Sequence, residues 1–150
     1  MKKSIIFLKE ENVGLVGISP DYLNNIDKVV DISVPKDCVF NIIEGDPNID
    51  LIFLGALKGF LSDNDKINFK YDTSKAKEIW LEHYRTARTP LLAALDVDFM
   101  RAVEVGNTDL QKEIVSKKQA LRDVTKTDLP DDLEGIKNTW PDILGQNPFA

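Results

Sequence analysis

The feature that most constrains the fold of this chain is a change of hydrophobic period near residue 72. Up to Tyr71, apolar residues occur in short runs that are rich in β-branched side chains and are separated by Asn, Asp, Gly and Pro. This pattern is typical of strands and turns. Beyond Ser74, apolar residues recur every three or four positions, which is the period of an amphipathic helix. We therefore predict an α+β chain with a small β-rich domain over residues 1–71 and a helical hairpin domain over residues 72–150.

The first part of the chain predicts a small, mostly antiparallel sheet, and the sequence leaves the strand order open. Pro and Asp separate the apolar runs, and the segment Ser19-Pro20-Asp21 is expected to begin a single helical turn through Ile26. The expected strands cover residues 4–8, 12–18, 28–34, 39–44, 51–54 and 67–71.

A long amphipathic helix is expected to follow the change of period. Side-chain oxygens at residues 72–74 can accept hydrogen bonds from the free amides of a first helical turn. Pro90 removes one backbone donor, so we expect either a kink near Ala87 or a break into two helices at residues 74–89 and 90–105. The apolar stripe of this segment consists of Ile79, Trp80, Tyr84, Ala87, Leu91, Leu92, Leu95, Phe99 and Val103.

A second helix is expected to fold back along the first. Gly106 and Asn107 readily adopt positive φ at a helix end, and Thr108 and Asp109 can cap the helix that follows. An antiparallel hairpin then buries the apolar side chains of both helices. On the second helix these are Leu110, Ile114, Val115, Leu121 and Val124.

A short helix and a tail complete the predicted hairpin domain. The helix is expected to begin near Pro130 and to end at Pro141. The tail over residues 145–150 is expected to be extended. One face of the short helix carries Leu133, Ile136 and Trp140.

Charge and composition exclude several classes of partner. The formal net charge of -6 argues against binding to DNA, RNA or an anionic membrane surface, which requires clustered Lys and Arg. The apolar stretch at residues 5–8 is too short for a signal peptide or a membrane span, so we expect neither. Cys38 is expected to be a half-buried thiol in a strand, which fits a reducing, cytoplasmic setting.

The residues that usually carry catalysis or bind metals are few. His83 lacks a His or Cys partner three or four positions away, so a surface histidine is expected rather than a zinc ligand. Asp96 and Asp98 are two positions apart, which places them on different faces of a helix. No Gly-rich phosphate loop is present. We therefore predict a protein that is not an enzyme, without metal or cofactor, although a catalytic pair of distant carboxylates stays an alternative.

Two sets of residues in the helical part allow two interpretations each. Trp80 and Trp140 belong either to the core or to a protein interface, since tryptophan is common in both. The basic residues of the helices either steer an acidic protein partner or form a solvated face with local ion pairs. These basic residues are Arg85, Arg88, Lys117, Lys118 and Arg122.

Three segments of the helical part resemble the tail assembly chaperone family of tailed bacteriophages. They are Tyr84 to Asp96 (YRTARTPLLAALD), Lys118 to Val124 (KQALRDV) and Thr139-Trp140-Pro141, and the likeness covers about residues 77–145. The family has the same order: an Arg-containing helix with Leu-Leu-Ala and an acidic residue, then Ala-Leu-Arg-Asp, then Trp-Pro. Val97 departs from it, because an aromatic residue often follows the Asp there, and residues 98–115 make the hairpin longer than usual.

The resemblance implies a protein that acts in virion assembly by binding another phage protein, without chemistry of its own. The expected partner is a tail, tail-fibre or other virion protein, and the expected location is the host cytoplasm. The alternative is a structural component retained in the virion, in the tail, fibre attachment, collar or capsid decoration, and self-association is left open. The residues expected to bind the partner are Trp80, Tyr84, Arg85, Arg88, Leu91, Leu95, Phe99, Leu121, Arg122 and Trp140.

Overall fold

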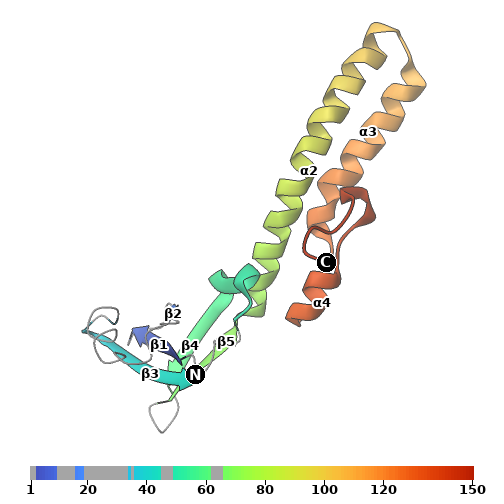
Figure 1. Ribbon diagram of the computed structural model, residues 1–150. Coiled ribbons are helices and arrows are strands. Elements are labelled where there is room, and N and C mark those ends of the chain that lie inside the picture. The colour runs from blue at the N-terminus through green and yellow to red at the C-terminus, as the bar shows by residue number, and fades with distance from the viewer. Residues whose placement is uncertain (1–2, 10–15, 19–33, 35, 45–48, 62–65) are drawn as a thin grey trace. The chain divides into compact units, whose positions relative to one another are not determined.

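A computed structural model describes residues 3–9, 16–18, 34, 36–44, 49–61 and 66–150 (Figure 1). The chain forms two compact units, Met1–Asp72 and Thr73–Ala150. The described strands belong to the first unit and the α-helices to the second, so the fold class is α+β, as the change of hydrophobic period predicted.

The first unit contains an antiparallel sheet with the strand order β2-β1-β3. Its strands are β1 (Lys3–Lys9), β2 (Val16–Ile18) and β3 (Cys38–Glu44). In the register of this sheet, Ile6 of β1 lies opposite Gly17 of β2 and opposite Asn41 of β3. The expected strand at 28–34 and the helical turn through Ile26 lie outside the described residues, apart from Val34.

The segment expected to be a strand at residues 51–54 is a 3-10 helix, η1 (Leu51–Ala56). The side chain of Asp50 accepts a hydrogen bond from the Ile52 amide at 3.1 Å, which favours a helical turn over a strand. The turn buries Phe53, whose side chain is 0% exposed. The strand prediction for this segment was therefore wrong, because a local cap outweighed the β propensity of the apolar residues.

A second antiparallel pair follows η1 and forms the core of the first unit. It consists of β4 (Leu57–Leu61), which the sequence analysis missed, and β5 (Ile67–Tyr71), which it predicted. Leu57 and Ile67 are buried, and Ile49, Phe69 and Tyr71 pack against them. The Ile67 amide donates to Oδ1 of Asn41 at 2.6 Å, and this bond ties β5 to β3.

The second unit begins with one long helix, α2 (Thr73–Glu104), which contains Pro90 (Figure 1). Of the two alternatives expected at this proline, the break into two helices was wrong, and the kink near Ala87 stays a prediction. An internal proline costs about 3 kcal/mol because it removes one hydrogen bond and crowds the preceding turn. The hydroxyls of Thr86 and Thr89 donate to the carbonyls of Glu82 and Arg85, so the turn before Pro90 keeps side-chain hydrogen bonds. Packing against the neighbouring helix supplies the remaining support, since α3 lies alongside α2.

The turn between the two long helices has a Schellman geometry. Gly106 has a φ of 68°, which is the left-handed conformation that glycine adopts without strain. Its amide donates to Val103, and the Asn107 amide donates to the carbonyl of Ala102 at 2.9 Å. The Asn107 side chain then caps α3 (Thr108–Asp123) by accepting from the Leu110 amide at 3.1 Å. Asn107, rather than the expected Thr108 or Asp109, is therefore the capping residue.

The chain returns to α2 through η2 (Val124–Lys126), α4 (Leu133–Asn138) and η3 (Asp142–Leu144). Asp132 caps α4 by accepting from the Gly135 amide at 2.6 Å. A Cβ atom at residue 135 would lie only 2.7 Å from the Asp132 carboxylate, so a larger residue there would displace the capping side chain. The helical turn η3 precedes the tail at residues 145–150 that was expected to be extended. Within that tail, the Ala150 amide donates to the carbonyl of Asn147 at 3.4 Å.

Aromatic side chains join the end of the chain to the beginning of α2. The indole nitrogen of Trp80 donates to the carbonyl oxygen of Thr139 at 2.9 Å, and the Tyr84 hydroxyl donates to the same oxygen. Trp140 and Phe149 pack against Trp80, with ring centroids 5.7 Å and 5.1 Å away. Because Trp80 and Tyr84 are both 0% exposed, this cluster is the core of the second unit.

Because Trp80 and Tyr84 share one carbonyl acceptor, we expect their substitutions to lower the free energy of unfolding by different amounts. Tyr84→Phe removes one hydrogen bond but leaves the Thr139 carbonyl bonded to Trp80, so we expect a loss of about 1 kcal/mol in the free energy of unfolding. Trp80→Ala also leaves a cavity, and we expect a loss of about 3–5 kcal/mol. Urea unfolding followed by circular dichroism measures both. Equal losses would show that the indole packing contributes nothing beyond its hydrogen bond.

An ion pair between α2 and the residues just before α4 predicts that the stability of the fold depends on pH. Lys77 donates a hydrogen bond to Asp131 and lowers the pKa of that carboxyl below its ordinary value of 3.8. A lowered folded-state pKa stabilises the fold above the unfolded pKa, and the contribution is lost as the pH falls through the folded pKa.

We therefore expect Asp131→Asn to lower the melting temperature slightly at neutral pH, and the difference from the unsubstituted chain to vanish in strong acid. The matched control is Asp128→Asn, because Asp128 is also exposed and forms no ion pair among the described residues. A difference that stays constant with pH would assign the effect to something other than this ion pair.

Candidate functional site

Three of the residues expected to bind a partner are buried inside the second unit. Trp80 and Tyr84 are 0% exposed, and Leu121 is 3% exposed. Leu121 faces α2 from α3, and the two aromatic residues face the Thr139 carbonyl. These three side chains have no surface to offer a partner, and their role is to hold the helices together.

Trp140, the second tryptophan for which core and interface were both open, packs within the same cluster. Its ring lies 5.3 Å from the ring of Tyr84, in an edge-on geometry. Its indole nitrogen is buried and has no hydrogen-bond acceptor among the described residues. Trp140 is therefore a packing residue like Trp80.

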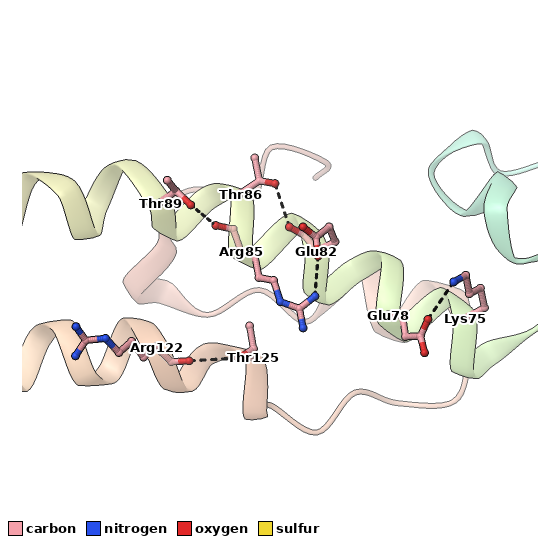
Figure 2. Close-up of polar contacts among 8 residues, drawn as sticks. All are labelled: Lys75, Glu78, Glu82, Arg85, Thr86, Thr89, Arg122 and Thr125. Carbon is pink, nitrogen blue, oxygen red and sulfur yellow. Dashed lines mark hydrogen bonds and ion pairs between the residues drawn. The ribbon is translucent and has the colours of Figure 1, made fainter.

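Arg85 lies on the exposed side of α2 in a row of alternating charges. Figure 2 shows its guanidinium directed toward Glu82, with an ion pair of 2.7 Å, and Lys75 directed toward Glu78 at 3.1 Å. These residues and Ile79 line a shallow hollow of about 470 Å³. Because each cation in it has a neighbouring carboxylate, the hollow is not a basic site. The interpretation as a solvated face with local ion pairs therefore applies to Arg85.

Arg88 has a structural partner at the end of α3. Its guanidinium donates to the carbonyl of Arg122 at 2.8 Å and lies 3.5 Å from the carbonyl of Leu121. The last carbonyls of a helix lack intrahelical donors and carry a partial negative charge, which a cation stabilises. Arg122 itself is exposed; Figure 2 shows its carbonyl accepting from the Thr125 hydroxyl while its guanidinium points away from that contact.

The distal half of the hairpin, residues 91–115, exposes large apolar side chains on both helices. Leu91 is 36% exposed, whereas Leu95 and Phe99 are half-buried between the helices. The other exposed apolar side chains of this half were not among the residues expected to bind a partner. They are Val97, Met100, Val103, Val105, Leu110 and Val115.

One face of the distal half is centred on Phe99. Lys118 of α3 forms an ion pair with Asp96, and its Nζ lies 5.7 Å from the centre of the Phe99 ring. Beside this pair, an open groove of about 360 Å³ is lined by Phe99, Thr108, Gln111, Lys112 and Val115. The groove lies along the joint between the two helices, and mostly carbon atoms line it.

The opposite face of the distal half carries Leu91 and Leu110. Leu110 precedes Val115 by five residues, a rotation of about 140° around α3, so the two side chains leave the helix on different sides. Leu110 is 38% exposed, and Leu91 of α2 is exposed to a similar extent. The hairpin thus presents apolar side chains on two faces.

The exposed residues were missed because a helical wheel does not show how many helices surround each stripe. Leu110 and Val115 fit the predicted apolar side of α3, but only Ile114 and Leu121 on that helix are buried. A two-helix hairpin has a single seam, which is too narrow to cover a wide apolar stripe. The available signal was the number of apolar side chains on each helix, which exceeds what one partner helix can bury.

The described residues contain no cluster of metal-ligating side chains, since no three His, Cys, Asp or Glu side chains gather within them as metal ligands would. The ring of His83 packs against Phe149 at 4.6 Å and against Trp80 at 5.7 Å, which makes it part of the aromatic cluster. In the same described part of the chain, no helix is both long and apolar enough to cross a membrane.

Comparison with protein-family models, with curated proteins and with solved structures gave no match.

The contact of Arg88 with the end of α3 predicts a stabilising role. We expect Arg88→Ala to lower the free energy of unfolding by about 1 kcal/mol, because it leaves the carbonyl of Arg122 without this donor. Arg85→Ala serves as the control, since Arg85 contacts only its own helix and should change stability little. Thermal and urea unfolding measure both, and equal effects would contradict the capping role.

Proposed function

We propose that this chain acts in the assembly of a tailed-bacteriophage virion by binding another phage protein through the distal half of its hairpin. The observation that supports this proposal most is the set of exposed apolar side chains on α2 and α3. Contiguous exposed apolar surface on a protein favours a role in protein binding. A hairpin with a packed base and an apolar tip is suited to cover an apolar segment of another protein during assembly.

The resemblance to tail assembly chaperones supplies the biological setting of the proposal. Several of its residues lie in the packing of the second unit: Tyr84 and Leu121 are core residues, Trp140 packs against Tyr84, and Arg88 contacts the end of α3. The resemblance therefore supports a shared hairpin architecture more directly than a shared partner. The residues that contact the partner are expected on the exposed surface, and Leu91 is one residue of the resembling segments that lies there.

We place the contact with the phage partner on the face that carries Leu91 and Leu110. Nearby ion pairs, Arg101 with Asp98 and Lys117 with Glu113, neutralise charge beside these leucines, so an apolar partner is favoured over a strongly charged one. An amphipathic helix or an unpaired strand of an unassembled tail or tail-fibre protein has this character. Binding would keep that segment from aggregating until it is built into the particle.

The test is capture of phage proteins from infected cells with the full chain as bait. We expect a tail or tail-fibre protein to be identified by mass spectrometry, and Leu110→Glu to reduce its recovery by at least roughly tenfold, because the substitution places a charge in an apolar contact. The matched control is Leu54→Glu, since Leu54 is an exposed leucine of the first unit and should not matter. Wild-type recovery with Leu110→Glu would exclude this face.

Mass spectrometry of purified virions from the same infection distinguishes a transient chaperone from a structural component. A chaperone should be present in infected cells and largely missing from purified virions. Recovery of this chain from virions in fixed proportion to a tail protein would instead indicate a structural component of the particle.

A further inference from the structure

The groove beside Phe99 belongs to a continuous face that draws on both helices, which we call the Phe99 face. Lys118 contacts both Asp96 and Phe99, so these two residues lie on the side of α2 that borders this face. Met100 and Val103 lie one helical turn beyond them, four residues after Asp96 and Phe99, and therefore continue the same side. They are 59% and 46% exposed. From α3, Val115 completes the face and is 52% exposed.

Two charges of opposite sign border the Phe99 face, one on each helix. Glu104 follows Met100 by one turn on α2, and Lys112 lines the groove on α3. Neither forms an ion pair within the described part of the chain, whereas Arg101, Lys117 and Lys118 each pair with a carboxylate. The Gln111 side chain donates to the carbonyl of Ala102 at 3.3 Å, which sets these two residues at the same level of the hairpin. Glu104 and Lys112 therefore lie within about one helical turn of each other along its length.

We propose that a second copy of this chain packs on the Phe99 face, with a two-fold axis parallel to the hairpin. Such an axis places α2 of one copy against α3 of the other at matching heights, as in an antiparallel four-helix bundle. Met100 then meets Val115 of the second copy. Glu104 meets Lys112 of the second copy, and the symmetry repeats both contacts. The face is complementary to itself, in apolar residues and in charge.

This self-complementarity favours a second copy over a helix from another protein. A foreign helix would have to supply one acid and one base at the spacing of Lys112 and Glu104, whereas a second copy carries both by symmetry. The proposal does not depend on the proposed function. It leaves Leu110 and its face free for a phage partner.

The size of the Phe99 face predicts a weak dimer. From Asp96 to Glu104 the face covers nine residues of α2, roughly 13 Å at 1.5 Å each, and two helices about 10 Å across make it roughly 20 Å wide. The contact then buries on the order of 600 Å² from both copies, which is the size of a weak, transient interface. We therefore expect a dissociation constant on the order of 100 μM.

Sedimentation velocity of the full chain over a wide concentration range tests the dimer. We expect a monomer–dimer equilibrium that Val115→Glu abolishes while the helical circular dichroism stays unchanged. Ile143→Glu is the matched control, because Ile143 is exposed in the same unit but lies outside the Phe99 face. This variant chain should dimerise normally. A chain that stays monomeric at every concentration, or a Val115→Glu variant that still dimerises, would overturn the proposal.

A charge swap tests the arrangement of the two copies. Glu104→Lys and Lys112→Glu should each weaken the dimer by roughly fivefold, because each places like charges opposite one another in both symmetric contacts. The double variant should restore wild-type affinity. A double variant that dimerises more weakly than either single one would exclude the parallel two-fold arrangement.

Capture from infected cells separates this proposal from the proposed function. Leu110→Glu should dimerise normally but fail to capture the phage partner, whereas Val115→Glu should capture it as a monomer. If the wild-type chain is monomeric and Val115→Glu loses the phage partner, the Phe99 face binds that partner instead of a second copy.

Discussion

The hairpin unit depends on one carbonyl oxygen, that of Thr139, which accepts hydrogen bonds from two buried aromatic side chains of α2. Trp80 and Tyr84 each bring a donor that has to be satisfied on burial, and a single acceptor from the end of the chain serves both. Burial raises the pKa of the Tyr84 hydroxyl, so that the hydroxyl stays a donor under ordinary conditions. Trp140 and Phe149 then pack around Trp80, and the terminal segment becomes part of the core.

With the base of the hairpin closed in this way, α3 is held at both of its ends. Asn107 caps the beginning of the helix and Gly106 permits the turn before it, whereas Arg88 reaches the carbonyls at its end. These contacts allow the two helices to extend well beyond the aromatic cluster without a third helix beside them. The physical consequence is an apolar tip with two faces, since one seam between two helices cannot cover all of their apolar side chains.

Packing residues and exposed residues therefore have different roles in this chain: the first hold the hairpin together, and the second are available to a partner. The segments that resemble tail assembly chaperones supply the core and the helix cap, and Trp140 illustrates this by packing against Tyr84. Leu110 and Val115, which are exposed on the two faces of the tip, lie outside those segments. Substitutions at these two exposed positions would alter the faces of the tip without removing a residue of the aromatic cluster.

The sequence by itself determined the α+β class, the long helix after residue 72, the turn at Gly106 and the antiparallel hairpin, because these follow from local period and from backbone preferences. Only the tertiary structure decided the rest. It kept α2 continuous through Pro90, because α3 packs alongside and supports the helix. It also packed both tryptophans into the aromatic cluster and left Val115 exposed, because burial depends on how many neighbours surround a helix, and no local pattern records that number.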